Sequence, residues 1–176
     1  MRKFTTRRLV FTAVLAAVYA ALTMALGFIS YGPFQFRVAE ALCVLPFFFP
    51  FTAWGLVIGC LLANLISTYG ALDIIFGTLA TVLCCLAVIA LGRGDKRSWI
   101  RCILACLMPV LFNAVIVGAL IAYFETDSLF TGAFWPAFWT NAFSVGFGEL
   151  VVLFVLGLPL MRWLPKSKFY SRLAAL

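Results

Sequence analysis

The 176-residue sequence contains no histidine and six acidic residues, and charged residues make up 11% of it. Without histidine, neither a Ser–His nor a Cys–His nucleophile–base pair can form, which excludes hydrolase chemistry of that kind. A soluble domain carries about 25% charged residues, so this chain has too little polar surface to face water on all sides. Hydrophobic residues make up 65%, and the mean hydropathy is +1.14. These values predict an all-α, polytopic membrane protein, with residues 1–176 as a single integral membrane domain.

Further absences narrow the function. The sequence has no GxxxxGK[ST] phosphate-binding loop and no row of acidic residues across an apolar segment that could relay protons. Its six cysteines lie in apolar runs without CxxC spacing, so we expect them to pack as small hydrophobic groups and not to bind zinc. We therefore expect no enzymatic activity, no metal and no cofactor. If the chain moves a solute, the energy comes from a partner protein.

The apolar segments predict a bundle of six transmembrane helices in which the second helix is short. That second segment carries two prolines near its end, Pro46 and Pro50, which cannot donate a backbone hydrogen bond and so terminate it. The last segment is long enough to protrude from the bilayer. The six helices are expected at about residues 8–29, 35–50, 52–67, 73–91, 99–124 and 134–164.

Twelve of the 13 basic residues flank apolar segments in three clusters, as is typical of cytoplasmic loops. With six spans, both termini and the connection between the fourth and fifth spans are expected in the cytoplasm. The connections 1–2, 3–4 and 5–6 are then expected on the extracellular side. Because the basic residues lie at the ends of the apolar segments, the positive net charge does not indicate a nucleic-acid partner. The clusters are Arg2, Lys3, Arg7 and Arg8; Arg93, Lys96, Arg97 and Arg101; and Arg162, Lys166, Lys168 and Arg172.

A few polar side chains within the apolar segments are candidates for substrate binding, because charge at bilayer depth costs about 2.5–3.5 kcal/mol. Each charged candidate has an alternative: a surface ion pair for Arg37 and Glu40, the helix dipole for Asp73, and helix packing for Glu149. An outward-opening pocket of these groups suits a flat ligand rich in hydrogen-bond donors, such as a guanine-like edge. The candidates are Arg37, Glu40, Asn64, Asp73, Trp139, Asn141 and Glu149.

Small residues recur at four-residue intervals in the first helix, at Ala13, Ala17 and Ala21. Such a stripe allows another helix to approach closely within lipid. The sequence leaves open whether that helix belongs to a partner subunit or to the same chain.

Several short motifs occur together in the sequence: FRVAEAL at 36–42, VLPF at 44–47, GCLLAN at 59–64 and DIIFGTLAT at 73–81. Together they resemble the QueT family of predicted queuosine-precursor transporters, and the likeness extends to Gly148 and Glu149. The resemblance implies a six-helix substrate-binding component (S-component) of an energy-coupling factor transporter. It would capture a 7-deazaguanine derivative from outside.

The same resemblance implies partners: a membrane-embedded coupling subunit (T subunit) and two cytoplasmic ATPase subunits, which use the ATP. The resemblance also implies that the chain docks on the coupling subunit through the alanine stripe, Ala13, Ala17 and Ala21. On the ligand, it suggests Glu149 for the ring edge and Glu40 or Asp73 for an aminomethyl substituent. Arg37 would either hold Glu40 in place or donate to the ring carbonyl, and the sequence does not separate these two roles. An S-component for another vitamin, a membrane assembly subunit without transport, and a self-contained secondary carrier remain alternatives.

Overall fold

The structure, a computed structural model, describes residues 5–30, 35–67, 69–96 and 98–175. Across these ranges the chain forms helices joined by short connections and contains no β-strand, which confirms the all-α prediction. Arg2, Lys3 and Arg97, three members of the basic clusters, lie outside the described residues.

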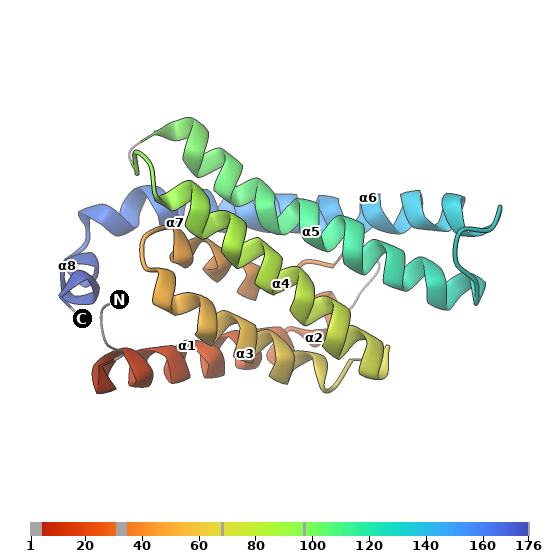
Figure 1. Cartoon of the computed structure of the whole chain (residues 1–176), viewed down its shortest axis with the longest axis horizontal. Helices are drawn as coiled ribbons and strands as arrows, with labels where there is room; N and C mark the ends of the chain where they lie inside the picture. The colour runs from red at the N-terminus through yellow and green to blue at the C-terminus, as the bar shows by residue number, and fades with distance from the viewer. Residues whose placement is uncertain (1–4, 31–34, 68, 97, 176) are drawn as a thin grey trace.

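Within the described ranges, four helical stretches are long and apolar enough to cross a membrane. They are α1 (Thr6–Ala25), α4 (Gly70–Gly92), α5 (Trp99–Thr126) and the stretch Phe134–Lys166. At 1.5 Å per residue, the 20 residues of α1 measure about 30 Å, the thickness of the bilayer hydrocarbon core. The protein is therefore a multi-pass membrane protein, with its long helices running side by side (Figure 1).

Two shorter apolar helices occupy the positions expected for the second and third spans. At the position of the second span lies a 3₁₀ helix, η1 (Val38–Phe47), which ends between Pro46 and Pro50. A 3₁₀ turn, η2 (Pro50–Thr52), then leads into α3 (Ala53–Asn64). Both are shorter than the four long stretches, so the count of six spans stays a prediction.

The last long stretch is not one uniform α-helix. It consists of α6 (Phe134–Val152), the π-helical segment η3 (Leu153–Gly157), α7 (Leu158–Trp163) and a 3₁₀ turn, η4 (Leu164–Lys166). Pro159 explains the change, because it has no amide hydrogen for the carbonyl of Val155, four residues earlier and inside the π segment. Two short helices complete the chain, α2 (Gly27–Ser30) after α1 and α8 (Lys168–Ala174) near the C-terminus.

Glycines set the closest approaches between helices. A Cβ added to Gly59 of α3 would lie 2.8 Å from the backbone oxygen of Ala16 on α1, and one on Gly118 of α5 would lie 2.8 Å from Cα of Ala142 on α6. Glycine therefore allows α1 to pack on α3, and α5 on α6, at backbone distance. Gly55 and Gly59 of α3 are therefore used for packing against α1 within the chain.

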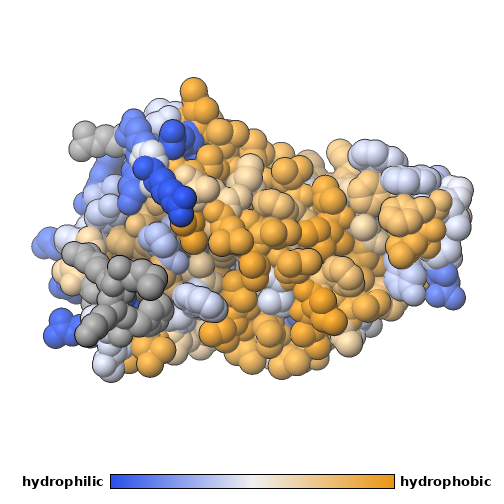
Figure 2. Space-filling model, in the orientation of Figure 1, coloured by the Kyte–Doolittle hydropathy of each residue, from blue (hydrophilic) through white to orange (hydrophobic). Residues whose placement is uncertain are grey.

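Residues from the three basic segments of the chain meet at one end of the bundle, around Phe48 and Phe51. The Arg8 guanidinium lies 5.3 Å from the ring centroid of Phe51, Lys96 Nζ donates to the Phe48 carbonyl at 3.4 Å, and the Tyr170 ring packs on Phe48. The start of α1, the end of α4, the start of α5 and the short helix α8 lie at this end (Figure 1). Figure 2 shows hydrophilic residues gathered there and a hydrophobic belt over the middle of the molecule.

Candidate functional site

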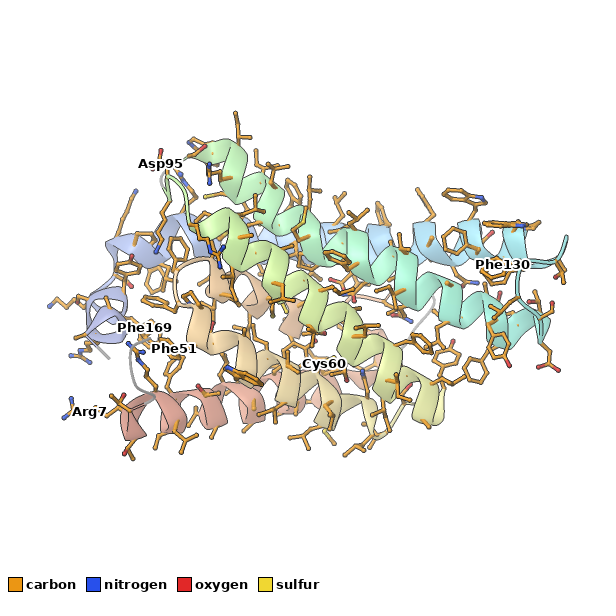
Figure 3. All side chains as sticks on the ribbon, viewed as in Figure 1. Arg7, Phe51, Cys60, Asp95, Phe130 and Phe169 are labelled. Carbon is orange, nitrogen blue, oxygen red and sulfur yellow. The ribbon has the colours of Figure 1, made fainter. Side chains whose placement is uncertain are left out.

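A cluster of buried polar side chains lies inside the bundle, and we call it the polar cluster. It includes all four charged side chains that are buried in the described part of the chain. The cluster comprises Tyr19 on α1, Arg37, Glu40 and Cys43 at η1, Cys60 and Asn64 on α3, Asp73 and Thr81 on α4, Asn113 on α5 and Glu149 on α6. Cys60, labelled in Figure 3, lies between the helices, while the labelled Arg7, Asp95 and Phe130 lie toward the two ends of the molecule.

Asn64 links Arg37 to the start of α4. Arg37 Nη2 donates to Asn64 Oδ1 at 2.9 Å, and Asn64 Nδ2 donates to the backbone oxygen of Asp73 at 3.2 Å. Gly77 leaves room for this arrangement, since a Cβ there would lie 2.6 Å from Asn64 Nδ2. Asp73 lies in the first turn of α4, is 2% exposed, and its Oδ1 accepts no hydrogen bond from the described residues.

Glu40 has a donor for each of its carboxylate oxygens. The Tyr19 hydroxyl donates to Oε1, and the Cys43 thiol donates to Oε2 at 3.0 Å. Arg37 and Glu40 are 3% and 1% exposed, so they do not form a surface ion pair. Because its donors come from α1 and from its own helix, Glu40 is held by the protein itself.

Glu149 lies near the middle of the last long stretch and is fully buried. Asn113 on α5 donates from Nδ2 to Glu149 Oε1 at 3.0 Å, whereas Oε2 has no hydrogen-bond donor among the described residues. Arg37 and Glu40 are the charged groups that act electrostatically on Glu149. The space beside it that Gly148 leaves is filled by the backbone of Gln35, since a Cβ on Gly148 would lie 2.8 Å from the Gln35 oxygen.

The cysteines do more than pack. All six are buried free thiols, as their apolar surroundings predict. Cys43 nevertheless donates to Glu40, and Cys60 accepts hydrogen bonds from Thr81 Oγ1 at 3.1 Å and from Asn64 Nδ2 at 3.4 Å. Two thiols therefore belong to the polar cluster. No group of three potential metal ligands forms among the described residues.

Charge in the polar cluster is unbalanced. The cluster holds three carboxyl groups and one guanidinium. Burial of unbalanced charge in an apolar surrounding is costly unless a partner neutralises it. With its open oxygens on Asp73 and Glu149, the cluster can accept hydrogen bonds from a ligand that supplies donors and positive charge.

The structure brings five of the seven predicted binding residues together, namely Arg37, Glu40, Asn64, Asp73 and Glu149. The other two lie apart, nearer the end of the bundle away from the basic clusters. Asn141 Nδ2 donates to Glu125 Oε2 at 2.8 Å, and 67% of the Trp139 side chain is exposed. An exposed tryptophan near a helix end is typical of the membrane interface.

Tyr69 marks the same end of the bundle. It precedes the first residue of α4, and its ring packs on Phe124 with centroids 5.2 Å apart. Burial raises the pKa of Tyr69, and the nearby carboxylates of Glu125 and Asp73 raise it further. Tyr69 therefore feels the charge of Glu125 and of Asp73, a member of the polar cluster.

Sequence reasoning missed five contributors to the cluster, namely Tyr19, Cys43, Cys60, Thr81 and Asn113. Asn113 carries a visible signal, an amide in the middle of an apolar helix. Tyr19 and Cys43 carry none, because a tyrosine or cysteine in an apolar run is common in membrane helices. Their roles depend on the Glu40 side chain of η1 pointing toward α1, and this tertiary contact is not visible in the sequence.

The alanine stripe of α1 faces away from the bundle. Ala13, Ala17 and Ala21 are exposed, while Ala16 and Ala20 of the same helix are buried. Internal packing of α1 therefore uses the other face, against Gly55 and Gly59 of α3.

A separate apolar groove of about 550 Å³ runs between α4 and α5. It lies on a different face of α4 from Asp73 and Gly77, and its walls contain no charged residue. The lining residues are Leu72, Phe76, Leu79, Val115, Ile116, Ala119, Leu120, Tyr123 and Leu129.

Comparisons with known proteins agree on one family. The model of the QueT transporter family matches residues 9–166, a range that includes the whole polar cluster. One curated relative, the "Queuosine precursor transporter QueT" of Lactococcus lactis subsp. cremoris (strain MG1363), is 41% identical over 85 residues, which are 47% of this chain and 50% of the relative. The chain thus matches about half the length of that relative. No solved structure matches the chain.

Proposed function

The chain belongs to the QueT transporter family, and from that premise we propose that it is the substrate-binding membrane subunit of an energy-coupling factor transporter. Its substrate is a queuosine precursor, a 7-deazaguanine derivative. Membership of a transporter family agrees with the expectation that the chain is not an enzyme.

The observation that carries this proposal is a pair of buried carboxylates with open oxygens. Glu149 Oε2 and Asp73 Oδ1 are both enclosed by protein and accept no hydrogen bond from the described residues. A buried acceptor left open costs about 1–3 kcal/mol. A ligand with N–H donors removes that cost, so the open oxygens favour binding.

The two open carboxylates suit different parts of a 7-deazaguanine. Glu149 accepts from the ring edge, because a carboxylate takes the N1–H and the 2-amino group as a bidentate acceptor. Asp73 accepts from a protonated aminomethyl substituent. Glu40, whose oxygens already have Tyr19 and Cys43 as donors, keeps Arg37 electrostatically balanced.

A cationic substituent also matches the charge of the polar cluster. Three carboxyl groups are buried with one guanidinium, so a protonated amine is favoured over a neutral substituent at the same position. Arg37, which already donates to Asn64, keeps the amide oriented beside the ligand. Asn141 and Trp139 are not part of this proposed site.

Partner docking through the alanine stripe fits the exposure of that stripe. Ala13, Ala17 and Ala21 allow a helix of the coupling subunit to approach α1 at backbone distance. Two ATPase subunits bound to the coupling subunit would use ATP, because this sequence contains no phosphate-binding loop. The basic end of the bundle, where α1 begins and α8 lies, faces the cytoplasm.

A direct binding experiment tests the proposal. The purified chain is heated with and without 7-aminomethyl-7-deazaguanine, and a panel of vitamins serves as comparison. We expect a rise in the unfolding temperature with the 7-deazaguanine alone and without ATP. Stabilisation by another vitamin would identify an S-component of different specificity. No stabilisation by any small molecule would support an assembly subunit instead.

A further inference from the structure

Asn113 and Glu149 form a composite hydrogen-bonding edge. Asn113 is 4% exposed and Glu149 is fully buried, and Nδ2 of the amide lies 3.0 Å from Oε1 of the carboxylate. Only the Nδ2 side of an asparagine amide can donate, so the contact fixes which way the amide is turned. Of the two hydrogens on Nδ2, one is used for Oε1 and the other is available.

Three hydrogen-bonding groups are therefore adjacent, connected in the order Glu149 Oε2, Glu149 Oε1 and Asn113 Nδ2. Glu149 Oε2 is an open acceptor, Glu149 Oε1 retains a second lone pair, and Asn113 Nδ2 offers its second hydrogen. In that order they are acceptor, acceptor, donor. A 2-amino-6-oxo pyrimidine ring, as in guanine, presents donor, donor, acceptor through its 2-amino group, its N1–H and its 6-oxygen.

We propose that Asn113 is a specificity-determining residue that donates to the 6-oxygen of the ligand while Glu149 accepts from N1–H and the 2-amino group. This inference rests on the proposed function and deepens it, because it assigns the edge by which the ring is read. An adenine-like edge presents an amino group where Asn113 donates and a bare nitrogen where Glu149 accepts. Both contacts are then lost, and the site rejects that ring.

Asn113 and Glu149 are enclosed by protein, so water does not compete for their hydrogen bonds to the ring edge of the ligand. One turn farther along each helix, Val117 on α5 and Val145 on α6 are 2% and 1% exposed, and Tyr69 packs against them. Arg37 and Glu40 act on Glu149 electrostatically. In such surroundings a mismatched hydrogen bond leaves a buried group without water to replace its partner.

Ligand analogues and a matched pair of variants test the assignment. Dissociation constants are measured by calorimetry for 7-aminomethyl-7-deazaguanine, for its 6-thio counterpart and for the counterpart that lacks the 2-amino group. The proteins are the unchanged chain, Asn113→Leu and, as the control, Asn141→Leu. Asn141 undergoes the same change on α6 but pairs with Glu125.

The unchanged chain is expected to bind the 6-oxo ligand about tenfold more tightly than the 6-thio ligand, since sulfur is the weaker acceptor. Asn113→Leu loses this preference and keeps the preference for the 2-amino group. Asn141→Leu keeps both preferences. Equal oxo-to-thio ratios in Asn113→Leu and the unchanged chain would overturn the role of Asn113, because the ratio would then reflect size alone.

Two further outcomes separate this inference from the proposed function. If Asn113→Leu fails to fold, the unchanged chain decides alone, and equal affinity for the oxo and thio ligands overturns the inference. If none of the three ligands binds the unchanged chain, the proposed function fails and the inference fails with it. A third result would overturn only the inference. In that case the unchanged chain binds the ligand and Glu149→Gln loses affinity, but the unchanged chain shows no preference for the 6-oxo over the 6-thio ligand.

Discussion

Tyr19 on α1 donates its hydroxyl hydrogen to Oε1 of Glu40 in η1, across 21 residues of sequence. This bond ties the first helix to the polar cluster. The same helix presents Ala13, Ala17 and Ala21 on its exposed face, so one helix contacts the cluster on one side and is open to a partner on the other.

Removing the Tyr19 hydroxyl is expected to destabilise the fold. In Tyr19→Phe, Oε1 of the buried Glu40 loses its donor, which costs about 1–3 kcal/mol. Thermal unfolding in detergent should show a lower midpoint temperature. Tyr123→Phe is the matched control, since Tyr123 lines the groove between α4 and α5 and the unfolding temperature should hardly change. An unchanged midpoint in Tyr19→Phe would show that the bond is not needed.

Glu149→Gln is expected to weaken ligand binding by about 2 kcal/mol or more, about 30-fold in Kd. An amide has one acceptor oxygen where the carboxylate has two, and it carries no charge to attract the ring donors. Isothermal titration calorimetry with 7-aminomethyl-7-deazaguanine measures the change. Glu125→Gln, an exposed carboxylate on α5, should bind as tightly as the unchanged chain. Full affinity in Glu149→Gln would remove Glu149 from the site.

Asp73→Asn is expected to lose affinity only for ligands that carry a cationic substituent. The aminomethyl ligand should bind at least about tenfold more weakly, because its ammonium group loses a charged acceptor. The affinity of unsubstituted 7-deazaguanine should change little. The exposed Asp127, in a backbone conformation that asparagine tolerates, supplies the control Asp127→Asn. Equal losses for both ligands would contradict the assignment of Asp73 to the substituent.

Ala17→Trp is expected to abolish co-purification with a coupling subunit while leaving ligand binding intact. The bulky ring keeps a second helix from approaching α1 at backbone distance. Affinity purification of the tagged chain from membranes, followed by calorimetry, gives both readouts. Ala90→Trp makes the same change at an exposed position of α4 and should keep the complex. Complex formation by Ala17→Trp would contradict docking through the stripe.

Gly59→Ala is expected to destabilise the chain by about 1–3 kcal/mol. The added Cβ would lie 2.8 Å from both the Ala16 oxygen and the Tyr19 Cβ, so α1 and α3 must move apart. Gly132→Ala is the control, because a Cβ there has no atom within 4 Å. Thermal unfolding of the two variants measures the difference, and equal midpoints would show that the helices adapt without cost.

Much of the fold follows from composition and periodicity. Long apolar runs fix α1, α4, α5 and the stretch Phe134–Lys166, because only helices satisfy the backbone inside lipid. The conformation of the second segment does not follow in the same way. A run with two prolines predicts a short helix, and its 3₁₀ geometry arises from the packing of residues 38–47 between the other helices.

The polar cluster was predictable where the bilayer makes a side chain conspicuous. Arg37, Glu40, Asn64, Asp73 and Glu149 stand out against apolar neighbours, and the structure gathers all five. Asn141 stands out equally, yet it pairs with Glu125 near the helix end. Sequence position gives depth along a helix but not the direction in which a side chain points. That direction depends on how neighbouring helices are rotated, which no local pattern encodes.

The π-helical segment η3 keeps two distant residues of the final stretch in phase. Glu149 and Met161 are both buried, at 0% and 1% exposure, although they are twelve residues apart. In an uninterrupted α-helix that separation would turn them about 120° away from each other. The wider turn at Leu153–Gly157 accommodates one extra residue, which reduces the offset to about 20°. Deleting a single residue there would rotate Glu149 by about 100° relative to Met161 and so turn it away from Asn113.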